Sequence, residues 1–135
     1  MSFINGDKSF DQQSSDGRYI DLSEDGNRII IGASGNDTNG DMAGNTKVYD
    51  FNSSGNNWTL VGNEILGEAT KDRSGYAVGI SGNGNRIIIG ALWNDGDTGI
   101  NTDIRGHARV FNYCLLYTSD AADEGLGVDL GGRRI

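Results

Sequence analysis

The chain has 135 residues, with 22 glycines, no proline, one cysteine and a formal net charge of −8. A single cysteine excludes an internal disulfide framework and a multi-thiolate metal site. The longest apolar runs are far too short for a membrane-spanning helix, so no membrane insertion is expected. The acidic balance, without any basic cluster, argues against nucleic acid as a partner.

The hydrophobic pattern predicts short strands separated by turns rich in Gly, Asn and Asp. Tyr76, Val78 and Ile80 alternate with smaller residues, which is the period of a half-buried strand. The only helix candidate covers 64–71, and Gly67 interrupts it. In chain order the predicted strands are Ile29–Ile31, Thr46–Phe51, Trp58–Val61, Tyr76–Ile80, Ile87–Ile89 and Ala108–Tyr113, with a turn at Ser81–Asn85.

The chain contains an internal repeat, because the octapeptide GNRIIIGA occurs twice. It spans Gly26–Ala33 and Gly84–Ala91, a shift of 58 positions. Beyond Asn94 the second copy gains four residues, so 47–49 match 109–111 at a shift of 62. Eight identical consecutive residues with a collinear flank are not a chance match, and they indicate a repeated structural unit.

Each repeat is expected to form four strands, and four strands at a period of roughly 60 residues are typical of a β-propeller blade. The isoleucine runs are apolar on both faces, so each sheet must stack on a neighbour. We therefore predict an all-β chain of about two four-stranded blades of an incomplete propeller, marginally stable or prone to aggregation by itself. The predicted ranges are 1–15 for a partial leading segment, 16–57 for the first repeat and 58–113 for the second.

Several motifs follow one another between residues 16 and 113, and some of them occur twice in register. They are D-x-S-G-x-x-V-x-x-S-x-x-G-N-R-I-I-I-G-A from Asp72, N-D-G from Asn94, G-H-A-R-V-F from Gly106, and W-x-L-V-G-N-E-I-x-G-E-A from Trp58. Together they resemble the bacterial FG-GAP repeat family of integrin-α-like β-propeller blades. The resemblance implies a seven-bladed propeller in a secreted or cell-surface protein. A closed ring would take on the order of 400 residues at this period, so further blades of the same chain would be missing.

The sequence departs from the family at the motifs that name it. Ser74–Tyr76 stands at the Phe-Gly position, and Leu92 replaces the proline of Gly-Ala-Pro, as Ser34 does in the first copy. The integrin-type calcium loop lies between these motifs, where this chain has Ser23–Asn27 and Ser81–Asn85. Calcium takes about six to eight oxygen ligands, several of them from carboxylates. Because the second stretch contains no acid, the resemblance does not extend to a calcium loop there.

Candidate calcium ligands lie instead in the loops that follow each Gly-Ala pair. Their Asn and Asp side chains alternate around flexible glycines and could offer oxygen atoms to Ca²⁺, the only cofactor we consider. The sequence favours the alternative, an Asx-rich turn whose side chains hydrogen-bond their own backbone. The candidate ligands are Asn36, Asp37, Asn39 and Asp41 in the first loop, and Asn94, Asp95, Asp97 and Asp103 in the second.

The chain shows no catalytic constellation, so we interpret it as non-enzymatic. The only histidine, His107, lies between Arg105 and Arg109, but a general base needs a nucleophile and an orienting acid, and no G-x-S-x-G motif is present. We expect His107 to be a hydrogen-bonding residue at a strand entry. Trp58 heads a strand and should pack inside a blade, whereas Trp93 lies in a loop where exposure would let it stack on a sugar ring.

Two arginines, Arg28 and Arg86, occupy the same position of the repeat. We expect each to pair with an acid between neighbouring blades. The glycine-rich stretches around them lack the lysine or the helix start of a phosphate-binding loop, so no nucleotide site is predicted.

Residues 114–135 resemble the conceptual translation of a sequencing-library adapter. Cys114–Asp123 back-translates to a transposase-end sequence and Val128–Ile135 to a flow-cell sequence, with eight bases between the blocks, the length of an index. The alternative is a native segment with a helix over Ser119–Glu124. We interpret 114–135 as a non-native tail and expect the natural protein to continue past Tyr113. Without the tail the chain has no cysteine and a net charge of −6.

Three functions are consistent with these observations. The first is a non-catalytic part of a secreted or cell-surface propeller that acts in adhesion or ligand binding, with an unknown protein or glycan bound by loops on one face. The second is an accessory propeller of a secreted hydrolase that acts on polysaccharide. The third is a structural spacer that binds neither cation nor glycan. The extracellular location rests on the family resemblance alone, because the first residues show no signal-peptide pattern.

Overall fold

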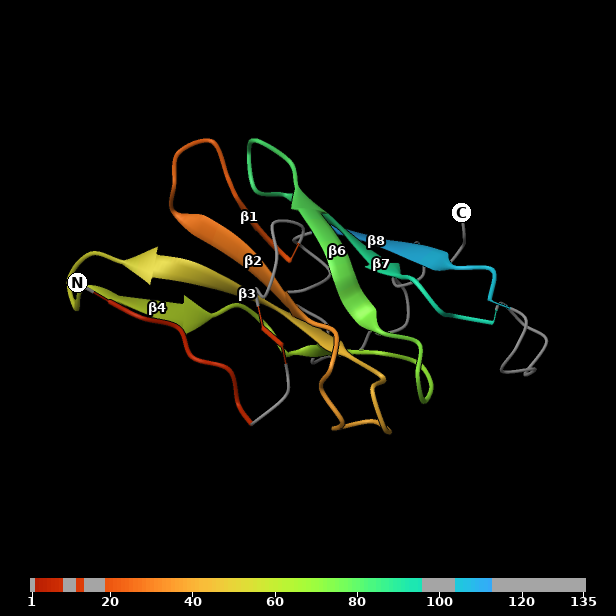
Figure 1. Ribbon diagram of the computed structural model, residues 1–135. Coiled ribbons are helices and arrows are strands. Elements are labelled where there is room, and N and C mark those ends of the chain that lie inside the picture. The colour runs from red at the N-terminus through yellow and green to blue at the C-terminus, as the bar shows by residue number, and fades with distance from the viewer. Residues whose placement is uncertain (1, 9–11, 14–18, 96–103, 113–135) are drawn as a thin grey trace.

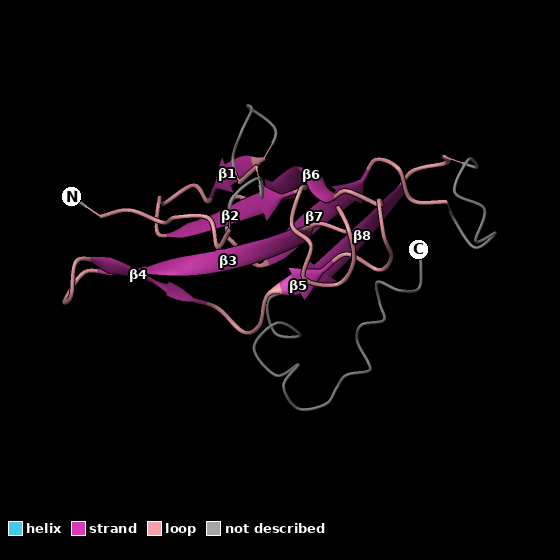
Figure 2. Ribbon diagram, turned by 60° about the horizontal axis from the view of Figure 1, so that its bottom comes forward, coloured by secondary structure: helices cyan, strands magenta, loops and turns pink. Residues whose placement is uncertain are grey.

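The computed structural model describes residues 2–8, 12–13, 19–95 and 104–112. Within these ranges the regular structure is entirely β-strand (Figures 1 and 2), which confirms the all-β prediction. The helix candidate over 64–71 is instead a short strand followed by turns. The strands are β1 (Ile20–Leu22), β2 (Arg28–Ala33), β3 (Asn45–Asn52), β4 (Asn57–Leu60), β5 (Ile65–Leu66), β6 (Ser74–Ile80), β7 (Arg86–Ala91) and β8 (His107–Asn112).

The strands form two antiparallel sheets. The first has the order β1-β2-β3-β4, with β5 also paired to β3, and the second has the order β6-β7-β8. In the first sheet Ile30 lies opposite Asp21 on one side and Val48 on the other. In the second sheet Ile88 lies opposite Gly79 and Val110. These are the same repeat positions, so the two sheets have equivalent registers.

The strand β4 belongs to the first sheet by its pairing. Phe51 lies opposite Trp58 in register, and their rings meet edge to face with centroids 5.2 Å apart. Trp58 therefore packs within a sheet, as predicted. The range 58–113, assigned to the second repeat from the sequence, begins inside this strand, so the sheet boundary and the repeat boundary do not coincide.

The hydrophobic core lies between the two sheets. Its buried members are Ile30 and Val48 from the first sheet, Val61 directly after β4, and Ile87 and Ile89 from the second sheet. Side by side in Figure 1, β2 and β6 bring the sheets into contact. Burial of this apolar surface is the main force that holds one sheet on the other.

The turns that join β1 to β2 and β6 to β7 repeat the same hydrogen bonds. The Ser23 hydroxyl donates to Asp25 Oδ1 at 2.9 Å, and the Ser81 hydroxyl donates to Asn83 Oδ1 at 2.9 Å. The turns lie side by side at the top of Figure 1, where the Glu24 amide donates to the carbonyl oxygen of Gly82 at 2.8 Å. The internal repeat is therefore a structural repeat as well as a sequence repeat.

Across the described ranges, no helix is both long enough and apolar enough to pass through a lipid bilayer.

Candidate functional site

Three connections gather at the end of the sheets opposite the two hairpin turns, and we call this region the loop end. It comprises the β2–β3 loop (34–44), the β5–β6 connection (67–73) and the described parts of the β7–β8 loop (92–95 and 104–106). The Lys71 amide donates to the Asp41 carbonyl at 2.7 Å, and the Trp93 amide donates to the Asp72 carbonyl at 3.1 Å. The β5–β6 connection therefore links the other two loops.

Asn36 and Asn94 are buried residues whose backbone carbonyls join the two ends of the β2–β3 loop and of the β7–β8 loop. Both are buried, with 0% and 3% of their surface exposed. The backbone carbonyl of Asn36 accepts from the Gly44 amide at 2.9 Å, and that of Asn94 accepts from the Gly106 amide at 3.0 Å. Each bond joins the start of a loop to the residue before its next strand, so both asparagines hold loop geometry.

The remaining described candidates of the first loop also bond to the protein. Asp37 Oδ1 accepts from the Met42 amide at 2.8 Å, Asn39 Nδ2 donates to the Gly67 carbonyl at 2.7 Å, and Asp41 Oδ2 lies 3.6 Å from Lys71 Nζ. The Thr38 amide donates to Asn36 Oδ1 at 2.9 Å, as in an Asx turn. The bonds to Asn36 and Asp37 are those of an Asx-rich turn, whereas Asn39 and Asp41 contact the β5–β6 connection.

Calcium binding at the loop end stays a prediction. Over the described residues, no three His, Cys, Asp or Glu side chains converge in a way that could hold a metal ion. Asp97 and Asp103 lie outside the described residues. Asp95 is half-buried next to Asn94, within the same loop.

Asp72 is a buried acid at the loop end that the sequence did not single out. Its Oδ2 accepts from Asn94 Nδ2 at 2.8 Å, and 3% of its surface is exposed. Burial raises the pKa of the Asp72 carboxyl above 3.8, the bond from Asn94 lowers it, and the nearby Asp95 and Glu68 raise it further. The charged form of Asp72 is therefore disfavoured in the fold.

Asp72→Asn is expected to raise the Tm at neutral pH. Because the folded chain holds the Asp72 proton more tightly than the unfolded chain, this group stabilises the fold below the unfolded pKa of 3.8, and the contribution is lost as the pH rises through the raised folded pKa. The asparagine keeps an acceptor for Asn94 and does not titrate. The Tm difference between Asp72→Asn and the unmodified chain should shrink toward zero on acidification. A difference independent of pH would contradict the assignment.

An aromatic side chain is exposed at the loop end, as predicted. Trp93 has 41% of its surface exposed, and the Arg73 guanidinium carbon lies 4.8 Å from the centroid of its ring. This cation–π contact supports one side of the indole. A shallow pocket of about 400 Å³ adjoins it, and Tyr76, Ile104 and His107 are among its lining residues. An aromatic wall beside polar groups is a typical ligand-binding arrangement.

His107 begins β8, opposite Ala91, at the strand entry expected from the sequence. Its Nε2 lies 3.5 Å from Oε1 of Glu68, which belongs to the β5–β6 connection. Nearby, Arg109 Nη2 donates to the Leu66 carbonyl at 3.0 Å and to the Ser74 hydroxyl at 3.1 Å. Burial lowers the pKa of Arg109, and the acids Glu68 and Asp72 oppose that shift.

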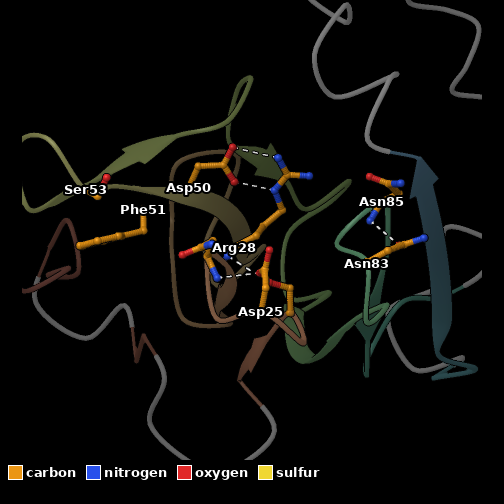
Figure 3. A pocket seen from close by; sticks show the side chains of 9 residues that line it. Asp25, Arg28, Asp50, Phe51, Ser53, Asn83 and Asn85 are labelled. Carbon is orange, nitrogen blue, oxygen red and sulfur yellow. Dashed lines mark hydrogen bonds and ion pairs between the residues drawn. The ribbon is translucent and has the colours of Figure 1, made fainter.

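A second, polar pocket of about 480 Å³ lies at the opposite end, between the two hairpin turns (Figure 3). Arg28 crosses it and forms a bidentate ion pair with Asp50, with Nε–Oδ1 at 2.5 Å and Nη2–Oδ2 at 2.8 Å. Asn83 and Asn85 line it on the side of the second sheet. Sequence reasoning missed this pocket, although the shared repeat position of Arg28 and Arg86 was a signal for it.

The prediction that these arginines meet acids between blades was wrong. Asp50 is the cross-strand neighbour of Arg28 in the same sheet, and Arg86 Nε donates at 3.0 Å to Asn112, which is likewise its own cross-strand neighbour. Residues directly opposite on antiparallel strands are the closest partners available. Arg28 Nη1 does reach the other sheet, where it donates to a backbone group, the Gly84 carbonyl, at 2.9 Å.

Asp25, the carboxylate of the β1–β2 turn that lines the polar pocket, is hydrogen-bonded to neighbouring residues of the same turn. Asp25 Oδ1 accepts from the Ser23 hydroxyl and from the Asn27 amide, each at 2.9 Å. The bonds from Asn27 and Ser23 lower the pKa of Asp25. Asn83 replaces Asp25 in the second turn and accepts the equivalent bonds, so a carboxylate is not required to build this turn.

No protein-family model, curated protein or solved structure matches the chain. The relation to the FG-GAP repeat family therefore stays a prediction from the repeat motifs.

Proposed function

We propose that the chain is part of a secreted or cell-surface β-propeller that binds a ligand without catalysing a reaction. Two observations support the propeller: the sheets are equivalent by repeat, and they stack face to face through apolar side chains. The number of blades, the extracellular location and a role in adhesion are proposed from the FG-GAP resemblance. Equivalent loops at one end of stacked sheets are a usual place for binding residues.

The exposed Trp93 is the observation that carries the binding proposal. A flat indole supported by Arg73 offers its free side to solvent beside a pocket with apolar and polar walls. Sugar rings present an apolar C–H face that packs on aromatic rings, while their hydroxyls need hydrogen-bond partners. A glycan is therefore the ligand class that we assign to the loop end, in preference to a protein.

Tryptophan fluorescence tests this assignment. In a Trp58→Phe background, Trp93 is the only tryptophan, and its emission can be followed while soluble hexasaccharides of neutral and uronic-acid polysaccharides are added. We expect a saturable change with at least one probe. Trp93→Ala, followed by calorimetry, should weaken that binding about tenfold or more, since truncation of a tryptophan at the centre of a binding site costs on the order of 2 kcal/mol.

Other outcomes would contradict the proposal. If none of the probes gives a saturable signal, the glycan assignment fails, and a protein ligand or a structural spacer replaces it. Affinity unchanged in Trp93→Ala would move the site away from the loop end. The titration is run with calcium chloride and with EDTA, because only a calcium-dependent response would support the Asn and Asp side chains of these loops as ligands.

A further inference from the structure

Each sheet has two faces, and inside the chain only one face of each is covered by the other sheet. We call the face of each sheet that carries Ile30 and Val48, or their repeat equivalents, the forward face, and the opposite face the rear face. In the first sheet, Ile30 and Val48 of the forward face pack on the second sheet. The rear face of the second sheet, which receives them, carries Val78, Ile80, Ile87, Ile89 and Phe111. The forward face of the second sheet and the rear face of the first sheet have no sheet against them among the described residues.

The repeat makes these two remaining faces copies of the two that already fit each other. Shifts of 58 and 62 positions carry Ile30 and Val48 to Ile88 and Val110 on the forward face of the second sheet. By the same shifts, the residues on the rear face of the second sheet have equivalents on the rear face of the first sheet. These equivalents are Ile20, Leu22, Ile29, Ile31 and Tyr49. The chain thus carries a second matching pair of faces that it cannot bring together by itself.

Exposure agrees with this comparison. Ile30 is 0% exposed, whereas its equivalent Ile88 is 46% exposed and borders an apolar hollow of about 380 Å³ that Val110 also lines. On the rear face of the first sheet, Ile20 and Leu22 of β1 are 42% and 50% exposed, whereas Ile31 of β2 is 5% exposed. Large apolar side chains that gather on a surface mark an interaction site.

We propose that a second copy of this chain docks head to tail, with the rear face of its first sheet on the forward face of the second sheet. The binding partner is a second copy because the contact between the two sheets inside the chain already joins a forward face to a rear face. A second copy supplies the same rear face to the forward face that is still uncovered. The N-terminal segment reaches the rear face at Lys47, where Asp7 pairs with it at 2.6 Å beside the buried Ile31. It leaves Ile20 and Leu22 of β1 exposed, so these two side chains are the part of the rear face that receives the second copy.

Polar contacts of the internal junction can be repeated in the docked pair. Inside the chain, Arg28 Nη1 donates to the Gly84 carbonyl and the Glu24 amide donates to the Gly82 carbonyl. The equivalent donors on the forward face of the second sheet are Arg86, which is exposed, and the Gly82 amide; they would meet Gly26 and Glu24 of the second copy.

One internal bond has no counterpart in the docked pair. Asp21 Oδ2 accepts from the Ile80 amide at 2.9 Å across the two sheets, and Gly79 stands at the position equivalent to Asp21. The docked contact is therefore weaker than the internal one, and it should depend on concentration. Because the contact is heterologous, each copy keeps one free face, so association continues into rings or filaments.

Sedimentation velocity of the full chain tests the proposal between about 5 and 200 µM. We expect the average mass to rise with concentration. Ile88→Lys and Leu22→Lys each place a charge in one of the two faces, so each variant alone should stay monomeric. An equimolar mixture keeps one intact face on each variant and should form a 1:1 dimer that grows no further. Ile104→Lys, at an exposed loop position outside both faces, should associate like the unmodified chain.

Other results would overturn the proposal. They are a monomeric unmodified chain at 200 µM, association that persists in either lysine variant, and a mixture that stays monomeric. Circular dichroism shows whether each variant is folded, and Ile88→Gln and Leu22→Gln replace any lysine variant that is not. The test is independent of the proposed glycan site, because Trp93 lies at the loop end and the docking faces do not include it.

Discussion

Gly32→Ala is expected to lower the free energy of unfolding by about 3 kcal/mol or more, a value at the upper end for overpacked positions. The Cβ of an alanine at this position would overlap the carbonyl oxygen and carbonyl carbon of Gly75 in the other sheet. Backbone atoms cannot move aside as a side chain can. Gly75 itself has a φ of +88°, a left-handed conformation that further restricts how β6 can adjust.

The matched control is Gly90→Ala, at the equivalent position of the second repeat. The nearest atom to a Cβ there is the Ala77 carbonyl oxygen at 3.5 Å, an ordinary contact. We expect a change below about 1 kcal/mol, since alanine in a strand also removes some unfolded-chain entropy. Urea unfolding followed by tryptophan emission measures both variants. If both variants lose the same free energy of unfolding, the close contact of Gly32 with Gly75 does not determine the distance between the two sheets.

Local chemistry in the sequence was sufficient to predict six of the eight strands and the turn between β6 and β7, but not the short strands β1 and β5. The β-branched runs become β2 and β7, and Ser81–Asn85 forms the turn expected from its Gly and Asn residues. Such features depend on side chains a few residues apart, so they can be deduced from a short stretch of chain. The Asx turn at Asn36, whose Oδ1 accepts from the Thr38 amide, belongs to the same kind of inference.

Contacts between distant segments were not predictable in the same way. Asp72 lies 22 positions from Asn94, and no local pattern indicates that its carboxylate is the partner of that amide. The exposure of Trp93 followed from its place in a loop, whereas its stacking partner Arg73 comes from another connection. The predicted arginine pairs failed for a related reason, because the register of β2 on β3 places Asp50 directly opposite Arg28.

The two copies of GNRIIIGA show the limit of sequence reasoning most directly. The hydrophobic pattern predicted burial on both faces for each isoleucine run. In the first sheet Ile30 is fully buried, but its identical counterpart Ile88 is 46% exposed. The difference lies entirely in what stands against each sheet, and the sequence of the octapeptide contains no information about that.

Ile30→Ala is expected to lower the free energy of unfolding by about 4 kcal/mol, which is within the range for truncation of a fully buried isoleucine. Ile30 is 0% exposed and belongs to the cluster that includes Val48, Ile87 and Ile89, so its truncation opens a cavity between the sheets. The surrounding strands are paired on both sides and can close that cavity only in part. Thermal and urea unfolding should both move to milder conditions.

Ile88→Ala removes the same atoms from the same octapeptide and is the control for this prediction. Because the side chain is half exposed already, we expect a loss below about 1 kcal/mol when the protein is dilute enough to be monomeric. At high concentration the loss should grow, since a docked copy would bury Ile88 as Ile30 is buried. Equal losses for Ile30→Ala and Ile88→Ala in the dilute monomer would contradict the burial difference between the two sheets. A loss for Ile88→Ala that does not change with concentration would instead count against docking on this face.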